Sequence, residues 1–296
     1  METWSVKNKV AMVTGGTSGM GLETCRALAK AGADLIIVGR NQQKCRKTID
    51  DLRVETGNQK INYLIADLSE MESVRKMAKE FHTKYDKLQL LVNNAGGFFL
   101  KRELTTEGLE KTFALNHLGH FLLTNLLLDI IEKSTPVRII NVSSWEHFRA
   151  RYDRENLQGE KDYAGWDAYN RSKLYNILFT YELARRLKDP KITVNTVHPG
   201  WVKTSIGKNN GILAKTVLPL MQLKAIPVDE GAKPCIYLCT SPDVAGVSGK
   251  YFDKMVCSPS SDESCNAENA RDLWQISEKL CKLQPAMSPR RWQYAG

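Results

Sequence analysis

The 296-residue chain contains no apolar run of the roughly 20 residues that a membrane-spanning helix needs. Residues 121–131 are apolar, but they are too few and are interrupted by Thr124, Asn125 and Asp129. Residues 1–9 are polar and lead directly into an expected strand, so they do not form a signal peptide. We therefore expect a cytoplasmic protein without a membrane anchor.

Paired cysteines of the kind that hold zinc are also missing. The chain has seven cysteines and no C-x-x-C pair. Cys235 and Cys239 are four residues apart on an expected helix, and no histidine pair lies near them in the sequence. These features exclude a zinc site of the usual spacing and favour reduced, structural thiols in a reducing compartment.

A concentrated basic segment is likewise absent, although the net charge is +9. The 42 lysines and arginines are spread through the expected helices and do not form an arm. This distribution indicates solvated helix faces and no nucleic-acid partner. A mildly positive field would still attract an anionic dinucleotide.

Short apolar runs alternate with helical patterns along the chain, which predicts one doubly wound parallel α/β sheet of about seven strands with helices on both faces. The expected strands are residues 10–13, 35–38, 61–66, 88–92, 137–142, 192–197 and about 250–252. We expect one domain over residues 1–284, followed by a disordered tail at 285–296.

Helix signals are clearest in four segments. Ser69 is expected to cap a helix that runs toward Tyr85, with Glu72 completing a capping box. A single long helix is expected from about 106 to 132, and others at 229–240 and about 267–283. Residues 203–228 mix glycines with apolar residues, which predicts a mobile lid over a substrate.

A glycine-rich turn directly follows the first strand and precedes a helix. Gly15 permits a tight turn, Gly19 lets backbone approach a pyrophosphate, and Gly21 lets the helix pack close to the strand. The N-terminus of that helix offers free N–H groups to a phosphate. We interpret the turn as a dinucleotide-binding site; the alternative is a flexible loop.

The second strand ends in Gly39 and Arg40, where enzymes that prefer NAD tend to place an acidic residue. Arg40 would bind a 2′-phosphate, and Lys44 on the next helix would assist it. The cofactor predicted from these residues is NADP(H). The alternative is a surface arginine that happens to follow a strand.

Polar residues follow the next two strands. Asp67 would hydrogen-bond an adenine amino group or simply form a turn. In the segment 93–97 small residues allow backbone to lie against a cofactor, and the asparagines can brace neighbouring strands. Asn116 lies within an apolar stretch and needs a partner, either for structure or as part of a proton path.

Tyr169 and Lys173 share one face of an expected helix, one turn apart. A nearby ammonium lowers the pKa of a tyrosine toward working pH, and such a phenol can protonate a carbonyl oxygen or deprotonate an alcohol. The alternative is a half-buried tyrosine beside a lysine that extends to solvent. Ser143 and Ser144 end the fifth strand and face the same crevice as the glycine turn.

Taken together, these motifs resemble the short-chain dehydrogenase/reductase family and imply its Rossmann-type fold. The resemblance covers about residues 9–252. Residues 39–40, 101–105, 198–202 and 249–252 resemble the retinol-dehydrogenase-like branch.

The resemblance implies a role for each of four residues. Tyr169 is the general acid/base, and Lys173 lowers its pKa and holds the nicotinamide ribose. Ser144, rather than Ser143, binds the substrate oxygen, and Asn116 holds a water that links Lys173 to solvent. The cofactor-binding residues it implies are Gly15, Thr17, Ser18, Gly19, Met20, Gly21, Arg40, Asp67, Leu68, Asn94, Ala95, Gly96, Tyr169, Lys173, Pro199, Gly200, Val202 and Thr204.

The expected function is an NADP(H)-dependent oxidoreductase that interconverts a small carbonyl compound and its alcohol. The alternatives are a retinoid or steroid alcohol dehydrogenase using the same site, and a dinucleotide-binding sensor without catalysis. The bulky, charged segment 145–150 would favour a polar or extended substrate. The resemblance also implies a homodimer or homotetramer that pairs through the helices of Asn116 and Tyr169.

Overall fold

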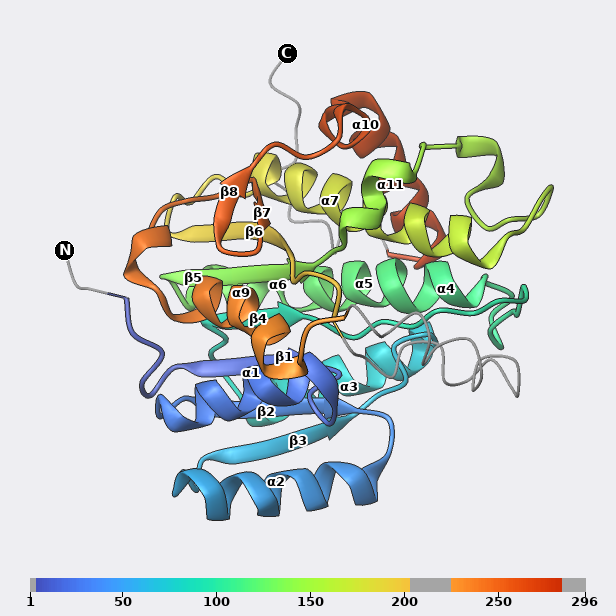
Figure 1. The fold of residues 1–296 in the computed structure, drawn as a ribbon. Coiled ribbons are helices and arrows are strands. Elements are labelled where there is room, and N and C mark those ends of the chain that lie inside the picture. The colour runs from blue at the N-terminus through green and yellow to red at the C-terminus, as the bar shows by residue number, and fades with distance from the viewer. Residues whose placement is uncertain (1–3, 203–224, 284–296) are drawn as a thin grey trace.

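The computed structural model describes residues 4–202 and 225–283. Their strands form one sheet in the order β3-β2-β1-β4-β5-β6-β7-β8, which runs from the bottom to the top of Figure 1. The strands are β1 Val10–Thr14, β2 Asp34–Gly39, β3 Ile61–Ile65, β4 Leu90–Asn93, β5 Val137–Val142, β6 Ile192–His198, β7 Lys250–Asp253 and β8 Val256–Ser258.

The first seven strands are parallel, as predicted, and β8 adds one antiparallel strand that sequence analysis missed. The central strands β4 and β5 are buried along their whole length, whereas β3 at the edge also has exposed and half-buried residues. Strands buried along their whole length, such as β4 and β5, are therefore covered on both faces.

Helices cover the sheet on both sides. One face packs against α1, α2 and α9, and the other packs against α3, α5 and α7, with α11 lying on α5 and α7. The longer helices are α1 Gly19–Lys30, α2 Gln42–Thr56, α3 Met71–Lys84, α5 Gly119–Leu126, α7 Gly165–Arg186, α9 Val228–Thr240 and α11 Ala267–Leu280. The shorter ones are α4 Lys111–Phe113, α6 Leu128–Lys133 and α10 Asp262–Cys265.

The single helix expected over residues 106–132 is wrong. The segment contains α4, a π-helical turn η1 (Ala114–Leu118), α5 and α6. Residues 104–110 instead form a small bridge between Leu104 and Glu110. Glu110 then begins α4, because its carboxylate accepts hydrogen bonds from the backbone N–H groups of Thr112 and Phe113.

The cap expected at Ser69 is also wrong. The hydroxyl of Ser69 donates to Asp67 Oδ1 at 2.6 Å, and α3 begins after Glu70. A carboxylate from elsewhere in the chain does the capping: Glu107 accepts hydrogen bonds from the N–H groups of Met71 and Glu72, each at 2.8 Å. Periodicity within the helix could not reveal a partner so far along the chain.

Buried asparagines brace the centre of the sheet, as predicted. Asn93 on β4 donates to Asn141 Oδ1 on β5 at 2.8 Å and to Thr124 Oγ1 on α5 at 3.0 Å. Within the described residues, no helix is both long and apolar enough to cross a membrane. The expected tail at 285–296 and most of the expected lid, residues 203–224, lie outside the described residues.

Candidate active site

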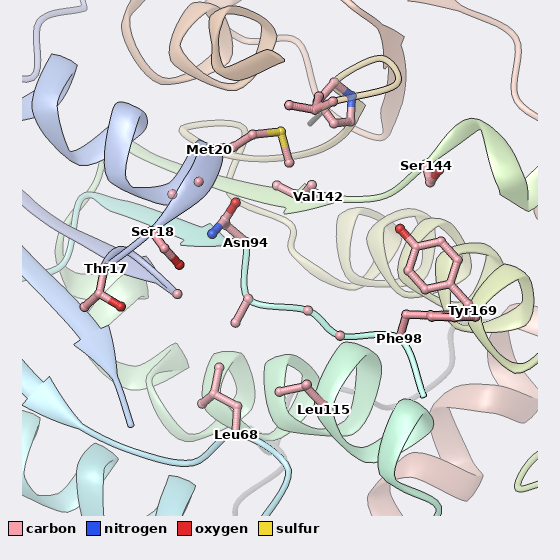
Figure 2. Close-up of a pocket in the computed structure, with 18 of the residues that line it drawn as sticks. Thr17, Ser18, Met20, Leu68, Asn94, Phe98, Leu115, Val142, Ser144 and Tyr169 are labelled. Atoms are coloured by element: carbon pink, nitrogen blue, oxygen red, sulfur yellow. The ribbon is translucent and has the colours of Figure 1, made fainter. Parts of the chain in front are cut away.

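A cavity of about 630 Å³ opens where the strand order reverses between β1 and β4, at the carboxyl ends of the strands. Figure 2 shows Thr17 and Ser18 at one end, Asn94 in the middle, and Ser144 and Tyr169 at the other end. The predicted residues that line it are Gly15, Thr17, Ser18, Gly19, Met20, Gly21, Arg40, Asp67, Leu68, Asn94, Ala95, Gly96, Ser144, Tyr169, Lys173, Pro199, Gly200 and Val202. Of the other two, Asn116 lies behind the cavity wall and Thr204 lies outside the described residues.

The glycine turn leaves room for a phosphate at the start of α1. Gly19 has φ +55°, and a Cβ placed there would meet nothing within 4 Å. A Cβ on Gly21 would lie 2.4 Å from the carbonyl oxygen of Gly15, so only glycine permits this close packing. The Ser18 hydroxyl makes no capping hydrogen bond, which leaves the first N–H groups of α1 available.

The glycine turn is tied to the segment after β4. Asn94 Nδ2 donates to the carbonyl oxygen of Thr14 at 2.8 Å. Thr14 Oγ1 in turn accepts from the backbone N–H groups of Asn94 at 2.9 Å and Ala95 at 3.0 Å. These hydrogen bonds hold the two loops side by side along the floor of the cavity.

Two cationic side chains line the cavity after β2. Arg40 and Lys44 are both exposed, and Asn41 begins α2 by accepting a hydrogen bond from the N–H of Lys44 at 2.9 Å. A Cβ on Gly39 would lie 2.7 Å from Cys45 Sγ, so the strand end packs closely on α2. Positive charge beside an open cavity suits a phosphate ligand.

Asp67 lines the same region and also forms a turn. Its Oδ1 accepts hydrogen bonds from the N–H and the hydroxyl of Ser69, at 2.9 and 2.6 Å. The structure therefore shows the turn that was one of the two interpretations of Asp67. Contact with an adenine amino group stays a prediction, since the residue also faces the cavity.

The far end of the cavity is formed by α7 and the end of β5. Ser143 Oγ donates to the carbonyl oxygen of Lys173 at 2.7 Å, so this serine fastens α7 to the sheet. The hydroxyl of Ser144 instead lies at the same end of the cavity as the phenol of Tyr169 and lowers its pKa. The ammonium of Lys173 is buried, 5.4 Å from the centre of the Tyr169 ring.

Burial controls the pKa values of this pair. Desolvation raises the pKa of Tyr169 to about 12, with a further rise from the charge of Glu146 and an opposing effect of the Ser144 hydrogen bond. Desolvation lowers the pKa of Lys173 to about 8. The expected lowering of the Tyr169 pKa is wrong for this structure, because the cost of burying a phenolate dominates.

Asn116 lies in the π-helical turn η1 and makes three hydrogen bonds with its side chain. Its Oδ1 accepts from Gly97 N at 2.8 Å, and its Nδ2 donates to Gly97 O and to Ser172 Oγ, each at 2.9 Å. The hydrogen-bond partners expected for the buried Asn116 are thus the backbone of Gly97 in the cavity wall and Ser172 on α7. A π-helical turn often marks a functional position, but a part for Asn116 in a proton path stays a prediction.

Residues 199–202, which follow β6, form one wall of the cavity. Gly200 has φ +96°, a conformation that favours glycine. Val202 forms an isolated parallel bridge with Ile226, and a Cβ on Gly231 would lie 2.3 Å from the Val202 side chain. Glycine at 231 therefore makes room for Val202 against α9.

Aromatic residues beside Tyr169 were not predicted as part of the site. The rings of Phe98 and Trp166 lie 4.5 Å apart, and Phe98 meets the edge of the Tyr169 ring at 5.9 Å. Trp201 and Glu146 also line the cavity. A signal for Trp166 was available, because it precedes Tyr169 by three residues on the same helix; nothing in the spacing indicated Phe98.

Comparison with known proteins agrees with this geometry. A family model described as short chain dehydrogenase matches residues 9–212. The chain belongs to the short-chain dehydrogenase family. As a short-chain dehydrogenase it is an alcohol/carbonyl oxidoreductase with a nicotinamide dinucleotide cofactor, of the retinol-dehydrogenase-like branch. Membership favours an enzyme over the non-catalytic sensor.

The short-chain dehydrogenase has curated relatives of similar length. It is 37% identical to human Retinol dehydrogenase 13 over 95% of this chain and 86% of that protein. It is 38% identical to human Polyprenol dehydrogenase over 93% of this chain and 85% of that protein. The names of these two relatives point to different substrates.

Solved structures share the fold over nearly the whole chain. An uncharacterized protein from Mycobacterium Paratuberculosis has a TM-score of 0.77 and 29% identity, over 95% of this chain and 96% of that one. A variant of Actinorhodin Polyketide Ketoreductase, solved with NADPH, has a TM-score of 0.65 and 27% identity, over 84% of this chain and 96% of that one. The second structure contains a dinucleotide of the kind that Arg40 suggests.

Proposed function

We propose that this enzyme reduces an aldehyde or ketone with NADPH, and that Tyr169 is its general acid. The main support is the placement of Tyr169, which lies with Ser144 at one end of the cavity. With a pKa of about 12, the phenol keeps its proton at neutral pH and can donate it. A protonated phenol is the form that reduction of a carbonyl requires.

The cofactor, when bound, supplies the hydride to the carbonyl carbon. Ser144 holds the carbonyl oxygen by a hydrogen bond and stabilises the charge that develops there. Tyr169 then transfers its phenolic proton to that oxygen, which yields the alcohol. The buried Lys173 ammonium favours the negative charge left on the phenol oxygen, and its lowered pKa makes it a readier proton donor to that oxygen than an exposed lysine would be.

NADP(H), rather than NAD(H), is proposed from the residues after β2. The side chains of Arg40 and Lys44 line the cavity, and within the described residues Asp67 and Glu146 are the acidic residues that line it. A guanidinium binds phosphate through paired hydrogen bonds. Arg40 would therefore hold the 2′-phosphate that distinguishes the two dinucleotides.

The replacement Tyr169→Phe tests this proposal directly, because it removes the acidic proton and keeps the ring. We expect turnover of aldehydes to fall roughly 1,000-fold, within the range that general acid–base catalysis contributes. Binding of NADPH, followed by fluorescence, should change less than threefold. A variant that retains a tenth of the wild-type turnover would exclude Tyr169 as the acid.

A retinoid is a second candidate substrate, favoured by the names of the relatives and by the aromatic rings of Phe98 and Trp166 beside Tyr169. The test compares all-trans-retinal with benzaldehyde at equal concentration, with NADPH oxidation as the signal. Preference for retinal by tenfold or more in kcat/KM supports the retinoid. Preference for benzaldehyde supports a reductase of smaller carbonyl compounds.

A further inference from the structure

A carboxylate lies at the substrate end of the cavity, and the reaction described above does not use it. Glu146 belongs to the short helix η2 (Trp145–Arg149), which begins immediately after Ser144. Its side chain lines the cavity together with Tyr169 and is 12% exposed. A carboxylate held at such a site is a strong determinant of what can enter.

Four hydrogen bonds hold η2 in place, so Glu146 is not on a loose loop. Ser144 Oγ accepts a hydrogen bond from the N–H of Glu146 at 3.3 Å, and the N–H of Trp145 donates to His198 Nδ1 at 3.1 Å. The buried His147 lies 2.7 Å from the carbonyl oxygen of Ser144 through Nδ1 and accepts from Ser261 N through Nε2 at 3.1 Å. The carboxylate is therefore presented from a fixed backbone.

The charge of Glu146 is only partly neutralised. Among the described residues its ion-pair partner is Arg149, at 3.6 Å, whose side chain is 65% exposed. Arg149 also lies over the ring of Trp145, 5.4 Å from its centre, on the solvent side of η2. An ion pair at this distance with one largely exposed partner is weak. The effect of Glu146 on the Tyr169 pKa indicates that its charge reaches the reacting phenol.

Flat apolar surface lines the same cavity as this carboxylate. Trp166 and Trp201 line the cavity and are 40% and 45% exposed, and Phe98 packs against Trp166. Indole rings offer stacking surface to a planar molecule and attract cations to their faces. Aromatic walls and one carboxylate suit a planar substrate that carries a hydrogen-bond donor or a positive charge.

We propose that Glu146 is a specificity-determining residue, which admits planar carbonyl compounds bearing an uncharged hydrogen-bond donor or a cationic group and rejects those bearing a carboxylate. The proposal deepens the proposed function, because it names the substrate class of the same site and rests on that reaction for its turnover assay. Two like charges within a partly desolvated cavity repel strongly enough to change affinity by about tenfold or more.

The test uses two aldehydes of matched size, 4-carboxybenzaldehyde and 4-formylbenzamide, which differ by the carboxylate charge. In the wild-type enzyme we expect kcat/KM with NADPH to be at least tenfold higher for the amide. In the variant Glu146→Gln this preference should shrink at least fivefold, because the ratio of the two substrates cancels any general loss of activity.

Two further variants separate charge from structure. Arg149→Gln removes the neutralising partner and should increase the preference for the amide. Glu155→Gln is the matched control, since Glu155 is an exposed carboxylate whose partner Lys161 also lies at 3.6 Å. An unchanged preference in Glu146→Gln, or an equal change in Glu155→Gln, would overturn the proposal.

Binding distinguishes failure of this proposal from failure of the proposed reaction. Trp166 and Trp201 line the cavity, so tryptophan fluorescence can follow binding of benzamide and benzoate without turnover. Tighter binding of benzamide that depends on Glu146 would support the charge selection even if neither aldehyde were reduced, and the absence of reduction would count against the reductase. Equal binding of both ligands in the wild-type protein would contradict the charge selection alone.

Discussion

At the scale of single residues, the site combines groups whose pKa values move in opposite directions. Tyr169 and Lys173 are one helical turn apart, and burial favours the neutral form of each. Sequence spacing predicted their proximity but not the extent of their burial, which depends on β5, η2 and the wall at Gly96. A Cβ placed on Gly96 would lie 3.6 Å from Lys173 Nζ, so small residues close the cavity over the ammonium.

This burial predicts how aldehyde reduction depends on pH. The pKa of Lys173 is lowered to about 8, so the lysine loses its charge as pH rises through that value, while Tyr169 keeps its proton. Because a neutral lysine no longer favours negative charge on the phenol oxygen, we expect kcat to fall at least threefold between about pH 7 and 9.5. The measurement is NADPH oxidation at saturating aldehyde.

Two substitutions test whether Lys173 causes the fall in kcat at high pH. Lys173→Arg replaces the amine with a guanidinium that does not titrate in this range, so any activity it retains should lack the decline. Lys76→Arg, at a lysine side chain that is 77% exposed, should keep the wild-type profile. A wild-type profile that stays flat over the same pH range would contradict the assignment to Lys173.

At the scale of elements, the C-terminal helix contributes more than its amphipathic pattern suggests. Trp274 of α11 is buried and meets Phe121 of α5 at 4.9 Å and Phe179 of α7 at 5.8 Å between ring centres. The guanidinium of Arg186 lies 4.2 Å from the centre of the same indole. Because α11 packs on the helix that carries Tyr169 and Lys173, it supports the site from behind.

The packing of α11 predicts a large effect of one truncation. Trp274→Ala should lower the free energy of unfolding by about 3–5 kcal/mol, the usual cost of removing a large buried aromatic side chain. Denaturant unfolding followed by circular dichroism measures the change. The control is Val256→Ala, whose side chain is 66% exposed and should change stability by less than about 0.5 kcal/mol. Equal stabilities of the two variants would show that α11 docks only weakly.

At the scale of the whole molecule, α11 also bears on assembly. The family resemblance implies pairing through the helices of Asn116 and Tyr169, and α11 covers part of that face by packing on α5 and α7. Pairing stays a prediction, and any pair that uses this face must accommodate α11 in its interface.

Cofactor binding should stabilise the whole fold by mass action. NADPH at roughly 100 times its dissociation constant adds about 2.7 kcal/mol to the free energy of unfolding, and NADH at the same concentration should add less. Differential scanning calorimetry measures both as shifts in Tm. In Arg40→Asp the shift with NADPH should shrink far more than the shift with NADH. If the two shrink equally, Arg40 does not distinguish the dinucleotides.

Local patterns in the sequence determined much of this protein. Seven short apolar runs predicted the seven parallel strands. Such runs are too short and too apolar for surface helices, and they suit strands that are buried on both faces. Glycines at 15, 19 and 21 marked the turn, since other residues strain at their conformations or clash at their close contacts. The Tyr169 and Lys173 pair followed from the geometry of one helical turn.

Contacts between distant segments were decided only in the tertiary structure. The cap at Glu107, the clamp of Asn116 on Gly97 and the meeting of Phe98 with Trp166 join residues whose separation in sequence follows no period. The raised pKa of Tyr169 has the same origin, because desolvation depends on everything packed around a group and not on its neighbour along the helix. The sequence therefore predicted the residue types that line the site. The arrangement of side chains at the substrate end of the cavity depended on the tertiary structure.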